Sequence, residues 1–278
     1  MSAKTKKRLR YVLLDALTLG LGLLVIFPIV YGFCGAFKTA SEFASQPPTV
    51  LPKSFFNFDN FRTVLRQIPI ARYFFNSLVV AVLVSSVKLI LAVLAAYAFV
   101  YYRFPGRKVL FFVILATMML PADTLLVTNY QTVARMGLLN TYLGMSIVSF
   151  VGASQMFMLR QAFKKIPPAL REAAVLDGCG DLRFLFRMLL PVCRPVLVTL
   201  FVQSFVATWN TYLWPLIVTT HNEMRTIQVG ISFITSTEGT NYEIILAGVM
   251  LSLVPALFVF LFLRRSISKA MTDGALVG

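Results

Sequence analysis

The sequence predicts an all-α membrane protein with six transmembrane helices, and three observations predict this fold class. The 278 residues are 58% hydrophobic and have a mean hydropathy of +0.78. Only 13% carry a charge, whereas charged residues make up about 25% of a typical soluble domain. The apolar residues also gather in runs of about 20 or more, which is the length a helix needs to cross roughly 30 Å of hydrocarbon.

The six apolar segments lie in chain order near residues 11–37, 75–101, 109–130, 142–163, 189–218 and 244–263. The first follows a basic start but is too long for the core of a signal peptide, so it is expected to remain as a span. The predicted organisation is a cytosolic N-terminus at 1–10, a transmembrane domain at 11–265 and a cytosolic tail at 266–278.

The distribution of Lys and Arg predicts the orientation. Of the 26 basic residues, eighteen fall on the side of the N-terminus, seven fall on the opposite side and Lys88 lies inside a span. Because basic residues concentrate on the cytosolic side of membrane proteins, both termini are expected in the cytosol. The net charge of +15 is therefore explained by topology and requires no nucleic-acid partner.

Two long loops are expected on the outer side. The loop at 38–73 ends in Asp59 as an expected N-cap, followed by Val64 and Ile68 on one helical face, which predicts a short amphipathic helix at the membrane surface. The loop at 219–243 is too polar and too rich in Gly and Thr to lie in lipid.

The cytosolic loop at 164–190 carries a polar run between two apolar segments. Pro168 can open a helix, since proline is tolerated in the first turn. Gly178 and Gly180 can end this helix in the left-handed conformation. The spacing places four residues on one face: Leu170, Ala173, Ala174 and Asp177.

A second short helix is expected at 182–189 in the same loop. Asp181 can cap its start, and Pro191 marks the entry to the fifth span. The product is a compact helix–turn–helix at the membrane surface. On composition alone, a plain surface linker explains the segment equally well.

Two ionisable residues lie deep within spans. Lys88 of the second span and Asp123 of the third are separated by only about 3 Å in depth, counted from the cytosolic ends. Because an unpaired charge at this depth is costly, we predict a structural ion pair between neighbouring spans. Contact with a solute or with a partner subunit is the alternative.

An aromatic and amide cluster lies in the outer half of the fifth span. It consists of Trp209, Asn210, Tyr212 and Trp214. Aromatic faces and amide groups together suit sugar binding, which predicts a place on a solute pathway. An aromatic belt at the membrane interface is the competing interpretation.

Catalytic and metal-binding patterns are missing from the sequence. There are no paired carboxylates, no HExxH run and no metal-like spacing among Cys34, Cys179 and Cys193. No GxxxxGK[ST] run occurs, so no ATP binding by that route, no cofactor, no metal site and no enzyme activity are expected. A stand-alone secondary transporter remains an alternative, although only Asp123 is a candidate ion-handling carboxylate.

Several motifs resemble those of ATP-binding-cassette importer permeases. The run Glu172-Ala173-Ala174-x-x-Asp177-Gly178-Cys179, with Leu190-Pro191 further on, resembles the family's EAA loop, which commonly has Ala at the position of Cys179. Within the family, Trp209-Asn210-x-Tyr212-Leu213-Trp214-Pro215 resembles the carbohydrate branch. The chain is most similar to the smaller six-span subunit of the maltose and glycerol-3-phosphate systems.

This resemblance implies a type I importer permease fold in a bacterial-type inner membrane, with a cytosolic coupling helix. The implied ATPase-coupling residues are Glu172, Ala173, Ala174, Asp177 and Gly178. The implied partners are a second permease, two ATPase subunits and an extracytoplasmic solute-binding protein. The solute would be a sugar or a sugar-like compound, including glycerol-3-phosphate or its diesters. The loop at 219–243 would reach into the binding protein, and the tail at 269–278 would insert between the ATPases.

Overall fold

The fold consists of helices joined by short loops. The structure is a computed structural model that describes residues 3–45, 47, 49–234 and 241–254, with the backbone alone at 3–10, 12, 122 and 123. Helices are the only regular elements in this described part, as the sequence predicted. The tail at 266–278 and the end of the sixth predicted span lie outside the described residues.

The chain divides into two compact units. One comprises Met1–Ile70 with Ile231–Pro255, and the other comprises Ala71–Gly230 with Ala256–Gly278. The first unit holds α1 (Ala3–Ala36), α2 (Ala40–Phe43), α3 (Asp59–Gln67) and an apolar helix at Tyr242–Val254.

The amphipathic helix predicted in the first outer loop is α3. Val64 is fully buried, and its methyl groups lie 3.8 Å from where a Cβ on Gly248 would stand, so α3 packs on the helix Tyr242–Val254. The prediction that Asp59 caps α3 is wrong. Phe58 occupies the N-cap position, while the Asp59 carboxylate pairs with Arg62 at 3.1 Å.

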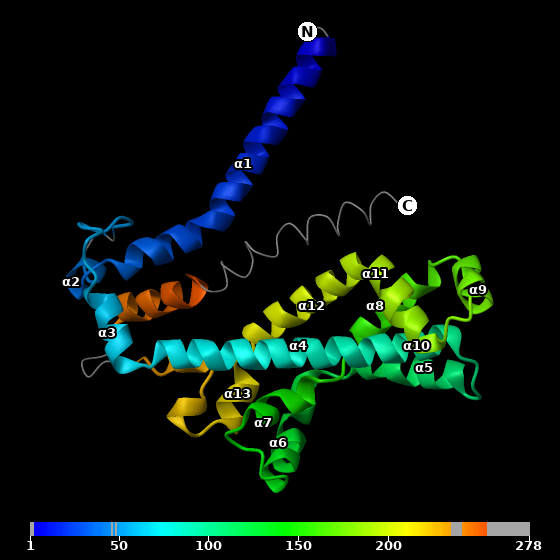
Figure 1. The fold of residues 1–278 in the computed structure, drawn as a ribbon. Helices are drawn as coiled ribbons and strands as arrows, with labels where there is room; N and C mark the ends of the chain where they lie inside the picture. The colour runs from blue at the N-terminus through cyan, green and yellow to red at the C-terminus, as the bar shows by residue number, and fades with distance from the viewer. Residues whose placement is uncertain (1–2, 46, 48, 235–240, 255–278) are drawn as a thin grey trace. The chain divides into compact units, whose positions relative to one another are not determined.

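The second unit begins with the long helix α4, and Figure 1 shows helices of this unit as far as α13. Its elements are α4 (Ile70–Tyr101), α5 (Arg107–Ala116), η1 (Thr117–Met119), η2 (Ala122–Leu125), α6 (Leu126–Arg135), α7 (Tyr142–Ser146), η3 (Ile147–Ser149), α8 (Ala153–Lys164), α9 (Pro168–Leu176), α10 (Asp181–Phe184), the π-helix η4 (Leu185–Leu189), α11 (Leu190–Val192), α12 (Arg194–Trp209), α13 (Leu213–Val218), η5 (Asn222–Met224) and α14 (Ile227–Ser232).

Two helices are long and apolar enough to cross a membrane on their own, Leu13–Ala36 and Ile70–Tyr101. Two further pairs of helices qualify only if each bent pair counts as one span. Tyr142–Ser149 meets Ala153–Lys164 at 55°, and Asp181–Val192 meets Arg194–Trp209 at 80°. The described residues therefore give two to four spans by length and composition.

The breaks have local causes. Leu120 is extended (ψ 122°) because Pro121 follows it and disfavours the helical conformation at the preceding residue. Gly152 is extended between η3 and α8. At the 80° bend, Pro195 stands in the first turn of α12, where it supplies no backbone donor and cannot continue the preceding helix.

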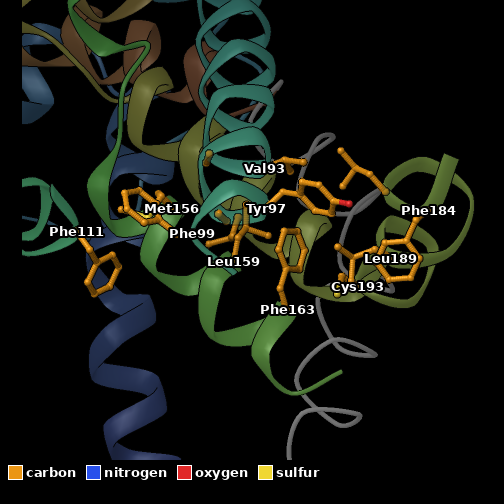
Figure 2. Packing of buried hydrophobic residues seen from close by; sticks show 14 of the residues in the cluster. Val93, Tyr97, Phe99, Phe111, Met156, Leu159, Phe163, Phe184, Leu189 and Cys193 are labelled. Carbon is orange, nitrogen blue, oxygen red and sulfur yellow. The ribbon is translucent and has the colours of Figure 1, made fainter. Parts of the chain in front are cut away.

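The larger hydrophobic core of the second unit lies between α4, α8 and the helices after α9. Figure 2 shows these side chains gathered from the three segments. Phe163 and Leu159 of α8 meet Val93 and Tyr97 of α4, and Phe184 closes the core from α10. This core holds the helices after α8 against the end of α4.

Candidate functional site

The EAA motif forms a helix and a tight turn, which we call the EAA hairpin (α9 to α11). Pro168 stands in the first turn of α9 as predicted. Just after α9 ends, Gly178 has φ +71°. The Gly178 N–H donates to Val175 O at 3.0 Å, and the Cys179 N–H donates to Ala174 O at 2.8 Å. This pair of bonds is the Schellman motif, which requires the left-handed residue that glycine supplies.

The four residues predicted to share a face of α9 are divided between two surfaces. Leu170 and Ala174 turn toward the core, with Ala174 only 1% exposed. Ala173 and Asp177 are exposed, together with Glu172. The small side chain of Ala174 thus serves packing within the chain, whereas Ala173 leaves an open surface.

The outer surface of the turn carries large apolar side chains. Leu176 is 88% exposed and Val175 is 55% exposed. Exposed apolar residues flanked by acidic ones are a common feature of protein contact surfaces.

The second helix of the hairpin begins earlier and ends later than predicted. It runs continuously from Asp181 to Val192 through one π-helical turn. The prediction that Asp181 caps this helix is wrong, because Gly180 occupies the N-cap position and the Asp181 carboxylate points elsewhere. Its Oδ2 accepts a hydrogen bond of 2.7 Å from Tyr102 Oη, and its Oδ1 pairs with Arg171.

Asp181 and Arg171 connect three segments. The Arg171 guanidinium lies 4.9 Å from the ring of Phe184, and the Phe184 ring contacts Tyr101 at 5.5 Å between centroids. The hydrogen bond from Tyr102, with the neighbouring Arg171 charge, holds the pKa of Asp181 below its ordinary value. The same hydrogen bond raises the pKa of Tyr102. The carboxylate therefore stays ionised and ties the hairpin to the end of α4.

Sequence reasoning missed this group of residues. Tyr102 and Asp181 are separated by 79 positions, and no local pattern links them. The only signal was an excess of tyrosines, at 97, 101 and 102, where the second span ends.

The predicted solute cluster surrounds the short link between α12 and α13. Trp209 is 5% exposed and contacts Phe74 and Phe205 at centroid distances of 5.4 and 5.9 Å. Trp214 is 8% exposed, and its Nε1 donates to Gly144 O at 3.2 Å. Both tryptophans thus have packing partners within the chain.

The other two members of the cluster are exposed. Asn210 ends α12, and its Nδ2 donates to Val206 O at 2.9 Å. No hydrogen bond to its Oδ1 occurs within the described residues. Tyr212 is 42% exposed. A cavity beside the two tryptophans leaves about 10 Å³, which is room for roughly one water molecule.

Lys88 and Asp123 were predicted to pair. Lys88 is half-buried, and its Cδ lies 3.1 Å from where a Cβ on Gly152 would stand. The aliphatic part of Lys88 therefore packs against the break between η3 and α8. The side chain of Asp123 lies outside the described residues, so the pairing stays a prediction.

The first part of the outer loop at 219–243 is fixed to the start of α4. Asn76 Nδ2 donates to the backbone oxygens of Glu223 and Arg225, both at 2.9 Å. Arg72 pairs with the Glu223 carboxylate at 3.2 Å, and Ser77 Oγ accepts from the Ile227 N–H at 2.8 Å. The loop thus has a folded base up to α14, and residues 235–240 lie outside the described part.

Residues 88–272 match the family described as binding-protein-dependent transport system inner membrane component. The chain belongs to this family. It is therefore a membrane-integral permease subunit of an ATP-binding-cassette importer, and ATP hydrolysis lies in partner subunits. Permeases of this kind work with a second permease, ATPases and a periplasmic binding protein. The resemblance carried by the EAA motif is confirmed.

Two relatives align with most of the length of this permease. The sn-glycerol-3-phosphate transport system permease protein UgpE of Pectobacterium atrosepticum is 33% identical over 259 residues, covering 90% of this chain and 92% of its own. The protein of the same name from Agrobacterium fabrum is 32% identical over 268 residues, covering 92% and 94%.

Solved structures support the fold. A chain of a bacterial ABC transporter involved in the import of the acidic polysaccharide alginate aligns with a TM-score of 0.82 at 22% identity, over 95% of this permease and 98% of that chain. A second structure, a bacterial alginate ABC transporter in complex with an alginate pentasaccharide-bound periplasmic protein, aligns with a TM-score of 0.67 at 19% identity, over 95% and 97%. The permease therefore has the importer permease fold.

Proposed function

We propose that this permease passes sn-glycerol-3-phosphate, or a diester of it, from a solute-binding protein into the cytosol. The names of two relatives that align over at least 90% of the chain support this solute. Six spans and cytosolic termini are part of the proposal, supported by the six apolar segments and by the excess of basic residues on one side. The transmembrane domain would extend over residues 11–265.

The EAA hairpin is the single observation that carries the ATP-driven part of the proposal. It presents an exposed acidic and apolar surface on one side and a packed face on the other. The packed face is tied to α4 through Asp181 and Tyr102. A force applied to the exposed surface of the EAA hairpin would therefore be transmitted directly into the long apolar helix α4.

Each residue of the EAA motif has a distinct role in this proposal. Glu172 and Asp177 pair with basic groups of the ATPase, and Ala173 allows close approach of its backbone. Ala174 anchors the helix from within, and Gly178 sets the turn that presents the surface. The tail at 269–278 would complete the contact by inserting between the ATPase subunits.

The solute pathway of this proposal includes Trp209, Asn210, Tyr212 and Trp214. The exposed Asn210 and Tyr212 would contact the solute, and the buried Trp209 and Trp214 would hold the link between α12 and α13. On the outer side, residues of the loop at 219–243 beyond its folded base would enter the binding protein.

Co-purification tests the role of the hairpin. The variant Leu176→Asp places a third charge on the exposed surface next to Asp177, and we expect it to lose the ATPase subunits in mild detergent. Leu51→Asp is the matched control, because Leu51 is also well exposed (64%) but lies in the first outer loop. Retention of the ATPases by Leu176→Asp at the level of Leu51→Asp would contradict the proposal.

Uptake by the assembled importer tests the solute. Cells that express the permease with its partners should accumulate labelled sn-glycerol-3-phosphate, and unlabelled glycerophosphodiesters should compete. Competition by maltose, with no competition by glycerophosphodiesters, would assign the solute to the neutral sugars instead.

A further inference from the structure

The strongest unassigned feature is a cavity where α5 begins and α8 ends, near the hairpin end of α4. Its volume is about 510 Å³, within the range of small-molecule sites. Four basic residues line it, and we call this site the basic pocket: Arg107, Lys108, Arg160 and Lys164. Three phenylalanines complete the lining, at 99, 111 and 112, and no acidic residue of the described part of the chain takes part.

The positive charge of the basic pocket is not balanced by the described part of the chain. The ion pairs among the described residues are Arg62–Asp59, Arg72–Glu223 and Arg171–Asp181. None of them includes a residue of the basic pocket. The α5 N-terminus adds to the positive potential, because Gly106 caps it without a side-chain acceptor. An anion bound here would reduce the mutual repulsion of four cations.

Arg160 is held in place within the pocket by a ring contact, but one of its hydrogen-bond donors has no acceptor. Its guanidinium carbon lies 4.1 Å from the centre of the Phe111 ring, and Phe111 in turn contacts Phe99 at 5.6 Å. The Arg160 Nε is buried and has no hydrogen-bond partner in the described structure. A buried donor without an acceptor is costly, and an anion held by the same guanidinium would offset part of that cost.

The surface next to the pocket is apolar and exposed. On α5, directly after the two basic residues, Val109 is 69% exposed, Phe112 is 67% exposed and Val113 is 56% exposed. In a membrane protein such residues face acyl chains. A site that joins a cluster of cations to an acyl-chain surface matches a lipid with an anionic headgroup, and basic pockets between membrane helices bind such lipids.

We propose that the basic pocket binds the phosphate headgroup of an anionic phospholipid, whose acyl chains lie along α5. The phosphate oxygens accept hydrogen bonds from Arg160 and Arg107, while Lys108 and Lys164 supply charge at the rim. This site is independent of the solute and of the ATPase contact. It predicts that the permease is stabilised by phosphatidylglycerol and not by phosphatidylcholine.

The test uses the complete importer in lipid nanodiscs and two double variants that remove the same charge. Lys108→Gln with Lys164→Gln removes two rim cations of the pocket, both exposed and without ion pairs in the described residues. Arg103→Gln with Lys165→Gln is the control, because these exposed neighbours do not line the pocket. Native mass spectrometry counts retained phosphatidylglycerol, and thermal midpoints give its apparent affinity.

The wild-type and control complexes should retain phosphatidylglycerol and gain thermal stability from it. The pocket variant should bind it about tenfold more weakly or worse, since each basic residue near a membrane surface contributes measurably to anionic-lipid affinity. Equal retention by the pocket variant would overturn the proposal. An equal thermal shift from inorganic phosphate or glycerol-3-phosphate would reassign the pocket to a soluble anion. Loss of the ATPase subunits with unchanged lipid retention would reassign it to protein contact.

Discussion

Tyr102 donates a 2.7 Å hydrogen bond to the Asp181 carboxylate and thereby joins the end of α4 to the EAA hairpin. Arg171 pairs with the same carboxylate from the other helix of the hairpin. A single charged group thus connects α4, α9 and α10. In the proposed coupling mechanism, this contact would be the route by which hairpin movement reaches a span.

Removing the Tyr102 hydroxyl is expected to weaken that route without removing the ATPase surface. Tyr102→Phe should lower uptake several-fold while the ATPase subunits still co-purify. Tyr101→Phe is the matched control, because the neighbouring Tyr101 packs its ring on Phe184 but its hydroxyl forms no hydrogen bond within the described residues. Uptake assays at equal protein levels compare the two, and equal uptake would contradict a mechanical role for the hydroxyl.

The folded base of the outer loop is expected to depend on Asn76. Asn76→Ala removes two bonds to the loop backbone and one from Tyr142 (2.7 Å), at a side chain only 1% exposed. The cost should be about 2 kcal/mol, or a fall of about 5 °C in the thermal midpoint. Ser85→Ala on the same helix should be nearly neutral, because the buried Ser85 Oγ has no partner in the described structure. A midpoint for Asn76→Ala as high as that of Ser85→Ala would contradict this account.

The predicted pair of Lys88 and Asp123 is tested by a double-mutant cycle. Lys88→Met should destabilise the permease more when Asp123 is present than in the Asp123→Asn background, because the first case leaves a carboxylate unpaired within a span. The thermal midpoints should reveal a coupling of roughly 1 kcal/mol or more. Additive effects would assign Lys88 to a solute or partner contact.

Asn210 is expected to act through its exposed amide oxygen. Asn210→Ala should raise the KM for uptake several-fold while leaving basal ATP hydrolysis unchanged, because the side chain makes one bond within its own helix end. Thr211→Ala serves as the neighbouring control, since Thr211 Oγ1 likewise donates within the same helix end, to Ala207 O at 3.1 Å. Unchanged affinity and rate in Asn210→Ala would remove the residue from the pathway.

The sequence predicted the features that depend on local chemistry. Pro168 opens α9 and Gly178 ends it because both effects depend on the backbone of the residue itself. The same reasoning failed for Asp59 and Asp181. A carboxylate at a helix start can either accept a hydrogen bond from the backbone or pair with a nearby arginine, and both of these carboxylates pair with an arginine.

Features that depend on tertiary contacts were not predictable. The division of Ala173 and Ala174 between two surfaces depends on where the core lies, which the spacing of α9 alone does not reveal. The length of the apolar runs predicted that the segments at 109–130, 142–163 and 189–218 are spans. It did not reveal that the helix in each of these segments is interrupted. Pro121 and Pro195 stand at two of these interruptions, but the bend angles depend on packing.

The most direct test of the central claim, that the EAA hairpin couples the permease to a separate ATPase, is ATP-driven solute accumulation in proteoliposomes by Gly178 variants. No atom lies within 4 Å of a Cβ added to Gly178, so a substitution there acts through its φ of +71° alone. Gly178→Val should reduce accumulation about tenfold, because the left-handed conformation costs roughly 1–2 kcal/mol. Gly178→Asn, which tolerates that conformation, and Gly180→Ser at φ −69° should remain close to wild type. Accumulation by Gly178→Val at the wild-type rate would contradict the account.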